Sequence, residues 1–379
     1  MSLILDEHRE YLSDHARLRG FQRAIEAVVQ EGAVVVDLGS GTGVLGLMAC
    51  RAGAARVYSI ESTSMIGVAR EIAHANGVAD RITFVREHSL QAELPERADV
   101  VVADQIGRFG FEAGVLHYFA DAHRRFLKPG GVTIPGRIDL LVAPVESDAM
   151  WSQVDFWDTT PLGLEMGAGR TIARNTGYPV RYSREDLLGP DEIVASLDPS
   201  VENDSPIHGR ASLRIERDGT LHGAGGWFAA EMSPGVTMTN SPLAEERIKR
   251  RNVFFPVERP VAVTAGDRVE VSMSIVPSEV MVDWDVTVTG ADGTSKAASR
   301  HSTFAGMLLS AEDLARTRPD FAPRLTPRGE ARRTVLSLCD GDRPLAAVEE
   351  ELYRRHGDLF PSPEDAALFA AEVVTRYAT

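Results

Sequence analysis

The chain has 379 residues, of which 44% are hydrophobic and 25% charged, as expected of a globular enzyme built from two or three packed units. Its formal net charge of −15 excludes a nucleic-acid binder, because phosphate contacts need clustered Lys and Arg, and leaves a peptide, a protein or a small molecule as substrate. The two cysteines, Cys50 and Cys339, lack neighbouring ligands, so neither disulfides nor a metal site are expected. Without a signal peptide or an apolar run of roughly 20 residues, a cytoplasmic protein with no membrane contact is predicted.

The first 136 residues predict an N-terminal helix followed by an α/β domain. Residues 6–30 have apolar side chains near helical spacing, and residues 1–30 are expected to lie over the ligand site of the domain at 31–136. The expected strands are 33–37, 56–61, 82–86, 98–103 and 132–134, and the expected helices are 44–52, 64–76 and 114–126, with a break at 129–131. Short apolar strands separated by helices indicate a parallel doubly wound sheet.

The pattern changes near Pro135, and residues 137–308 predict an antiparallel β domain. Apolar and polar side chains alternate with period two, as in the stretch VEVSMSI at 269–275. Turn signals stand at Asp218-Gly219, Gly266-Asp267 and Gly290-Ala-Asp-Gly293.

Residues 309–379 predict a small helical domain. Thr326-Pro327 is expected to open one helix, and Pro344 a second. Ser362-Pro363 is a strong start signal for a third, because a capping residue precedes a proline at the first helical position and acids follow in the first turn.

The sequence D-L-G-S-G-T-G at 37–43 joins a strand to a helix and predicts a nucleotide site. Its glycines let the backbone bend and approach a ligand, and the helix behind offers free N–H groups to a carboxylate or phosphate. Glu61 ends the next strand, where a carboxylate can accept hydrogen bonds from two ribose hydroxyls. The G-x-G-x-G spacing, with Asp37 leading in, favours S-adenosylmethionine over a nicotinamide dinucleotide. The candidate cofactor-binding residues here are Asp37, Gly39, Ser40, Gly41, Glu61, Ser62 and Ser89.

Several segments resemble the protein arginine methyltransferases over residues 5–305. They are 11–25, 36–45, 52–61, 93–104, 126–135, the stretch GWFAAE at 226–231 and the stretch VFFP at 253–256. The resemblance implies a Rossmann-like seven-stranded methyltransferase domain followed by an antiparallel β-barrel with a dimerisation element, working as a homodimer. It also implies that Arg17, in Leu-x-Asp-x-x-Arg, pairs with the methionine carboxylate of the cofactor.

The acceptor loop departs from this family, which clamps the substrate guanidinium between two glutamates. A planar, permanently charged guanidinium wants two carboxylates in fixed geometry. Here Asp104 and Glu112 take the two places and are the candidate catalytic residues, with one residue deleted between them and Arg108 able to pair with either. The family's Thr-His-Trp loop is replaced by Arg247-Ile248-Lys249 in a basic stretch. Either the acids still bind a cationic acceptor, or Arg247, Lys249 or Arg250 orients another nucleophile such as a carboxylate.

The C-terminal segment resembles winged-helix domains of the pyrroloquinoline-quinone D type, which recognise leader sequences of ribosomally made precursor peptides. Val335, Leu338, Asp340-Gly341, Pro344, Val348 and Leu352 carry this pattern, which a packing or dimerisation appendage would also satisfy. The sequence therefore predicts an S-adenosylmethionine-dependent methyltransferase, with N-methylation of a peptide or protein side chain favoured and a natural-product precursor peptide as one such substrate. The alternatives are a small-molecule N- or O-methyltransferase and a non-catalytic partner of an active enzyme.

Overall fold

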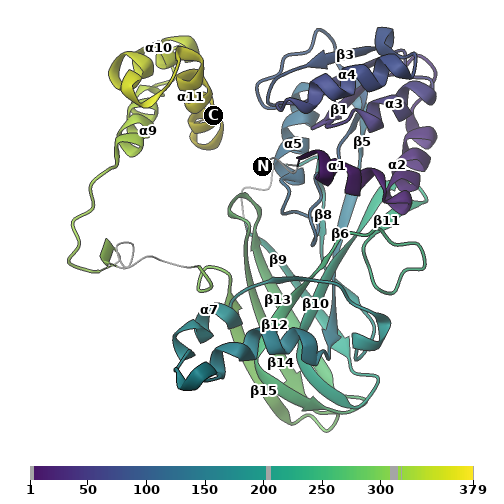
Figure 1. The fold of residues 1–379 in the computed structure, drawn as a ribbon, viewed down its shortest axis with the longest axis vertical. Helices are drawn as coiled ribbons and strands as arrows, with labels where there is room; N and C mark the ends of the chain where they lie inside the picture. The colour runs from purple at the N-terminus through teal and green to yellow at the C-terminus, as the bar shows by residue number, and fades with distance from the viewer. Residues whose placement is uncertain (1–3, 202–205, 308–314, 317, 379) are drawn as a thin grey trace. The chain divides into compact units, whose positions relative to one another are not determined.

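The chain divides into two compact units, residues 1–307 and 308–379. The computed structural model describes residues 4–378 apart from 202–205, 308–314 and 317. Within the first unit, a parallel sheet with its helices adjoins a domain of long antiparallel strands (Figure 1). No helix among these residues is long and apolar enough to cross a membrane.

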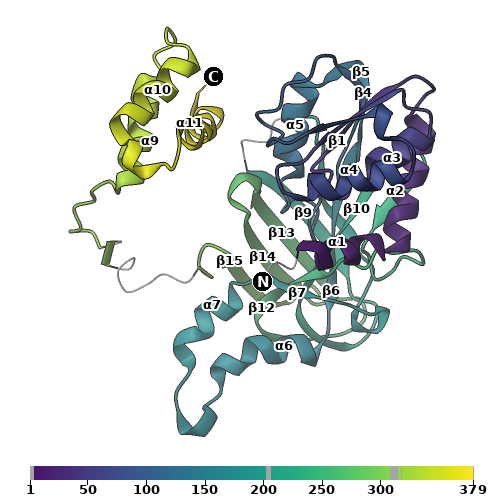
Figure 2. The same ribbon diagram turned by 45° about the horizontal axis from the view of Figure 1, so that its top comes forward.

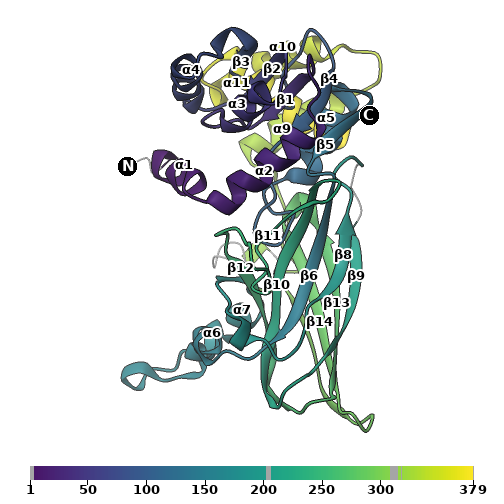
Figure 3. The same ribbon diagram turned by 90° about the vertical axis from the view of Figure 1, so that its right-hand side faces the viewer.

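The helical stretch predicted over residues 6–30 forms two helices. They are α1 (Ile4–Leu12) and α2 (His15–Val28). The break has a local cause: the Ser13 hydroxyl donates to the Arg9 and Glu10 carbonyls, and the Asp14 carboxylate caps α2 by accepting from the Arg17 N–H. The change of direction lets α2 contact both α3 and the β domain (Figure 3).

A parallel sheet forms the core of the first domain, in the order β3-β2-β1-β4-β5. Its strands are β1 (Val34–Leu38), β2 (Arg56–Ile60), β3 (Ile82–Val85), β4 (Ala98–Val102) and β5 (Leu127–Ile134). The helices α3 (Val44–Arg51), α4 (Met65–Ala75) and α5 (Val115–Arg125) connect them. β1 pairs with β2 on one side and with β4 on the other, so the strand order reverses at the carboxyl end of β1, the usual place for a ligand crevice.

Two expectations for this sheet were wrong. It has five strands, not seven, because the chain leaves β5 through Ile134-Pro135 and enters the antiparallel domain. The glycine-rich stretch 129–131 does not precede β5 but lies within it, where a shift of register on β4 between Ala98 and Val100 accommodates the extra residues.

The second domain consists of two antiparallel sheets. One has the order β7-β12-β10-β6-β8, with β11 beside β10, and the other the order β15-β14-β13-β9. The strands are β6 (Arg137–Val145), β7 (Tyr178–Val180), β8 (Glu192–Leu197), β9 (Ile207–Arg214), β10 (Gly219–Ser233), β11 (Val236–Thr239), β12 (Asn252–Val263), β13 (Arg268–Val276), β14 (Met281–Thr289) and β15 (Ser295–Ser302). The three predicted turns lie between β9 and β10, β12 and β13, and β14 and β15.

The expected barrel is open, because no backbone ladder joins the two sheets among the described strands. They share a hydrophobic core instead, which includes Leu213, Phe228 and Trp284. The Trp284 indole N–H donates to the Pro256 carbonyl at 2.9 Å and so ties β14 to β12.

A helical arm interrupts the β domain after β6 and was not predicted. It runs through α6 (Asp148–Asp155), the short 3-10 segments Phe156–Asp158, Pro161–Gly163 and Gly167–Gly169, and α7 (Arg170–Arg174). Figure 2 shows the arm extending away from the strands. Its base is fixed by Arg174, which pairs with Asp158 at 2.7 Å and with Glu258 of β12 at 2.6 Å.

The second unit contains the three predicted helices. They are α9 (Pro327–Leu338), α10 (Leu345–His356) and α11 (Pro363–Tyr377), with Thr326 and Ser362 capping α9 and α11 as expected. Their apolar faces, including Val335, Val348 and Leu352, form a core of their own. A winged-helix domain also needs a β-hairpin, and the described residues of this unit contain no strand; residues 308–314 and 317 lie outside the described part.

Candidate cofactor and acceptor site

The glycine loop follows β1 and needs glycine for two reasons. Gly39 and Gly41 have φ angles of 61° and 54°, a left-handed conformation that other residues rarely adopt. A Cβ atom on Gly41 would lie 2.5 Å from the His8 ring, and one on Gly39 would lie 2.6 Å from the Gln105 amide nitrogen. The loop is therefore closely covered by α1 and by the segment after β4.

The two acids of the glycine-loop region lie where the sequence placed them. The Glu61 carboxylate accepts hydrogen bonds from the N–H groups of Gly41 at 2.9 Å and Thr63 at 2.8 Å, which holds it against the loop. The Asp37 carboxylate accepts from the Gly46 N–H at 2.9 Å. Complete burial raises the pKa of Asp37 to about 7, more than its hydrogen bond lowers it.

Buried polar atoms without a partner gather around this loop. The carboxylate oxygen Oδ1 of Asp37, the Ser40 hydroxyl and the Gln105 carbonyl oxygen make no hydrogen bond to any residue that the structure describes. Such atoms are rare in folded proteins and call for a ligand or water. A nucleoside carrying an amino-acid group would supply donors and acceptors, so the residues present fit S-adenosylmethionine.

The two remaining candidate serines lie outside the glycine loop. Ser62 is exposed in the turn after β2, and Ser89 is half-buried with its carbonyl accepting from Arg125. His8 was missed by the sequence analysis, although its ring lies over Gly41. No local signal could reveal that contact, because it depends on how α1 packs across the loop.

Arg17 is nearly buried, with a relative exposure of 6%, but its guanidinium is bound to Asp104. Its Nη1 atom donates to the Tyr11 carbonyl at 3.4 Å, and the Tyr11 ring lies 5.2 Å from the guanidinium carbon. The pairing of Arg17 with Asp104 was not predicted from the sequence. The proposed role toward the cofactor carboxylate remains a prediction.

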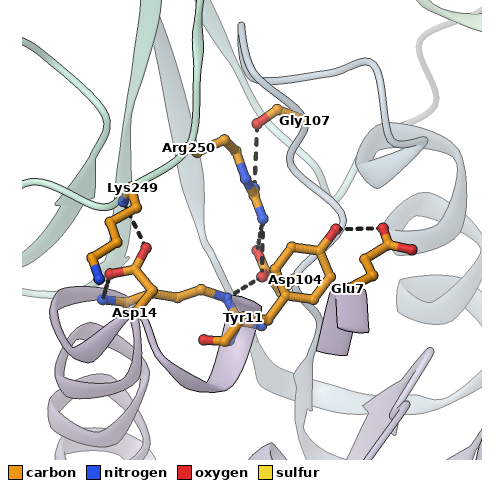
Figure 4. A network of polar contacts seen from close by, with 8 residues as sticks. Glu7, Tyr11, Asp14, Asp104, Gly107, Lys249 and Arg250 are labelled. Carbon is orange, nitrogen blue, oxygen red and sulfur yellow. Dashed lines mark hydrogen bonds and ion pairs between the residues drawn. The ribbon is translucent and has the colours of Figure 1, made fainter. Parts of the chain in front are cut away.

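Asp104 lies two residues beyond β4 and is held between two arginines. Arg17 binds one of its oxygens, and the Nη2 atom of Arg250 lies 3.1 and 3.3 Å from the two oxygens (Figure 4). Burial alone would raise the pKa of Asp104, but Arg250 and Arg17 outweigh it and lower the pKa below its ordinary value. Asp104 is therefore an anion with two cationic partners.

Glu112 is held by its own loop. Its carboxylate accepts from the N–H groups of Phe109, at 2.9 and 3.0 Å, and Phe111, at 3.3 Å. Gly107, with a φ angle of 86°, makes room for it, because a Cβ there would lie 2.3 Å from the Glu112 carboxylate. Arg108 is exposed and forms no ion pair with either acid among the described contacts, so the predicted possibility that it neutralises one of them is wrong.

The basic stretch at 247–251 packs against this site. The Lys249 N–H donates to the Asp14 carboxylate at 2.6 Å, and Ile248 is buried. Arg247 donates to the Tyr182 carbonyl at 3.3 Å, away from the acids. Of the three cations proposed to orient an acceptor, Arg250 alone bonds to Asp104 in the described structure (Figure 4).

Two protein-family models match the chain, and they meet at the boundary between the parallel-sheet domain and the β domain. Residues 14–138 match the ribosomal protein L11 methyltransferase (PrmA) model, and residues 137–289 match the arginine methyltransferase oligomerization subdomain. Protein arginine N-methyltransferase 6 of Xenopus laevis is 28% identical over 289 residues, which cover 72% of this chain and 84% of that protein. The arginine N(omega)-methyltransferase of Streptomyces achromogenes subsp. streptozoticus is 29% identical over 273 residues, covering 69% and 73%.

Solved structures show the same fold. The Trypanosoma brucei PRMT1 enzyme-prozyme heterotetrameric complex with AdoHcy matches with a TM-score of 0.71 and 20% identity, covering 78% of this chain and 97% of that one. Arabidopsis thaliana protein arginine methyltransferase 10 matches with a TM-score of 0.66 and 21% identity, covering 79% and 98%. The chain is therefore an S-adenosylmethionine-dependent methyltransferase, similar to the protein arginine methyltransferases in both its parallel-sheet and its β domain.

Proposed function

We propose that the chain methylates a guanidinium nitrogen of an arginine side chain in a peptide or protein. The observation that carries this proposal is that the acceptor loop already binds a guanidinium. Arg250 donates to the Asp104 carboxylate and, through Nη1, to the Gly107 carbonyl at 3.2 Å (Figure 4). A loop with this pairing of carboxylate and carbonyl has the geometry that a planar cation requires.

In the proposed mechanism the chain positions the two reactants. Glu61 and the glycine loop hold the nucleoside part of the cofactor, and Arg17 directs a nitrogen at its carboxylate. When bound, S-adenosylmethionine would supply the methyl group: a carbon–nitrogen bond would form as the carbon–sulfur bond breaks, the electron pair of the broken bond would stay on sulfur, and the proton lost by nitrogen would pass to solvent water. Asp104 and Glu112 orient the acceptor and stabilise its positive charge while that bond forms.

The finer proposals concern substrate and assembly. The sequence resemblance of the C-terminal segment to leader-binding domains supports a peptide-binding role, with a ribosomally made precursor peptide as the substrate. The exposed arm and the match of residues 137–289 to an oligomerization subdomain support a homodimer. The similarity to an arginine N(omega)-methyltransferase of Streptomyces favours one further candidate substrate, the small molecule arginine itself.

An assay of methyl transfer tests the proposed activity. The full chain is incubated with S-adenosylmethionine and either an arginine-containing peptide or the same peptide with lysine in place of arginine, and intact mass reports the added methyl groups. We expect methylation of the first peptide only, and loss of about 100-fold in rate for Asp104→Asn, because the neutral amide no longer holds the guanidinium in position.

The control for that variant is Glu71→Gln, an exposed carboxylate on α4, which should keep full activity. An alkali-labile product would identify a methyl ester and an O-methyltransferase instead. Full activity of the Asp104 variant would remove the acceptor role from this loop.

A further inference from the structure

Arg250 is an internal competitor for the acceptor carboxylate. Its guanidinium contacts both oxygens of Asp104 and the Gly107 carbonyl, which are the groups proposed to receive an acceptor guanidinium. The pair is well shielded from solvent, with side-chain exposures of 15% for Arg250 and 7% for Asp104. An arginine held in place by its own chain competes at a high effective concentration.

The charges around Asp104 do not balance. One carboxylate faces two guanidinium groups, from Arg17 and Arg250, so the three side chains carry a net positive charge. Burial acts to lower the pKa of Arg250, yet Asp104 outweighs burial and raises that pKa, so Arg250 remains charged.

Other neighbouring acids make no bond to Arg250 in the described structure, although Glu112 acts on it through space and helps to raise its pKa. Glu112 turns its carboxylate to the N–H groups of its own loop rather than to Arg250. Glu246, which precedes the basic stretch, pairs instead with Arg19 at 2.8 Å and Arg23 at 3.2 Å on α2. Arg17 and Arg250 together therefore present like charge to a cation that approaches Asp104.

An acceptor can offset this repulsion by bringing its own anion. We propose that Arg250 determines the charge of the acceptor, so that the site takes a guanidinium with a carboxylate close by, either the α-carboxylate of an amino acid or an acidic neighbour in a peptide. This inference rests on the proposed arginine methylation. The acceptor guanidinium binds Asp104 in place of Arg250. The displaced Arg250 then pairs with the acceptor carboxylate, which can accept two parallel hydrogen bonds from its planar guanidinium.

Two matched pairs of acceptors test the inference and separate the two sources of carboxylate. L-Arginine is compared with agmatine, which has the same guanidinium and lacks the carboxylate, and a peptide with aspartate beside its arginine is compared with the same peptide carrying asparagine. For the wild type, kcat/KM should favour the acidic member of at least one pair by about tenfold or more, the effect of one partly screened ion pair.

Three variants assign the preference to Arg250. Arg250→Gln should reduce it to about threefold or less, whereas Arg250→Lys, which keeps the charge, should retain part of it. Arg251→Gln, an exposed neighbour outside the site, should leave it unchanged. Thermal unfolding and calorimetric binding of S-adenosylmethionine check that each variant is folded.

The outcomes separate this inference from the proposed function. Equal kcat/KM for both members of each pair in the wild type would overturn the role of Arg250, and so would an undiminished preference in folded Arg250→Gln. If no guanidinium compound is methylated by any of these proteins, the proposed function fails and this inference fails with it.

Discussion

Burial gives the Asp37 carboxyl group a different pKa in the folded chain than in the unfolded chain. Asp37 is completely buried, its pKa is raised to about 7, and one of its oxygens has no partner among the residues that the structure describes. The folded chain therefore keeps this proton up to about pH 7, whereas the unfolded chain releases it near pH 4. Protonation of Asp37 thus favours the folded state, and this contribution is lost as pH rises between those values.

Asp37→Asn should remove this pH dependence. Its amide oxygen can still accept from Gly46, but the side chain carries no charge to bury. Without cofactor, the free energy of unfolding of the variant minus that of the wild type should rise with pH by about 1.4 kcal/mol per unit between pH 5 and 7, then level off. Urea unfolding at several pH values measures this difference, and parallel curves for the two proteins would contradict it.

The neighbours of a residue can be predicted where a motif fixes the local backbone, but not where contacts cross the fold. Gly39, Gly41 and Glu61 lie together as expected because the loop and the carboxyl end of β2 are neighbours in any sheet of this order. The pairing of Asp104 with Arg250 joins residues 146 positions apart, and nothing in either segment encodes it.

Among the elements, the arm between β6 and β7 has the most unusual surface. Its base is held by Arg174, whereas its outer part exposes large apolar side chains. Leu162 is fully exposed, Leu164 is 58% exposed and Phe156 is 48% exposed. Apolar side chains grouped in this way on a fixed support usually mark an interface.

Leu162→Asp should convert the proposed homodimer to monomer, because a charge would be buried without a partner in the interface. Light scattering after size-exclusion chromatography gives the mass in solution. Val280→Asp is the matched control, since Val280 is 49% exposed in a turn outside the arm. A dimer that persists in the Leu162 variant, or a wild-type monomer, would contradict the role of the arm.

Element-scale prediction from the sequence placed the first four strands of the parallel sheet to within one residue at each end but missed the start of β5. The three C-terminal helices begin where they were predicted, because Thr326 and Ser362 cap the adjacent backbone and Pro344 fixes its own φ angle. The position of the break between α1 and α2 was not predicted, although Ser13 and Asp14 are residues that compete with helix hydrogen bonding. The arm was missed because its helices are short and lie among period-two strands.

At the scale of the whole molecule, the C-terminal unit is separate in both packing and family resemblance. Its core includes Ala331, Leu352 and Val373 and is distinct from the core of residues 1–307. The family matches end at residue 289, before this unit begins. Its proposed task, holding a precursor peptide by its leader, is therefore separable from methyl transfer.

Removal of residues 308–379 should leave methylation of a short leaderless peptide within about twofold, because the remaining unit is compact by itself. Methylation of a precursor that carries its leader should become weaker through an increase in KM at constant kcat, since the deletion removes binding that does not change during the reaction. Steady-state rates for both substrates measure this split. An unchanged KM for the precursor would make the unit a packing appendage.

The position of Arg17 between two sites would couple the binding of the two substrates. In its proposed role it serves two carboxylates, that of Asp104 in this structure and that of the arriving methyl donor. Donor binding would draw positive charge away from Asp104 and leave this acid more attractive to an incoming cation. The two substrates would then strengthen each other's binding, and by thermodynamic linkage to the same degree. Through this one guanidinium, an occupied cofactor site would strengthen binding at the acceptor loop.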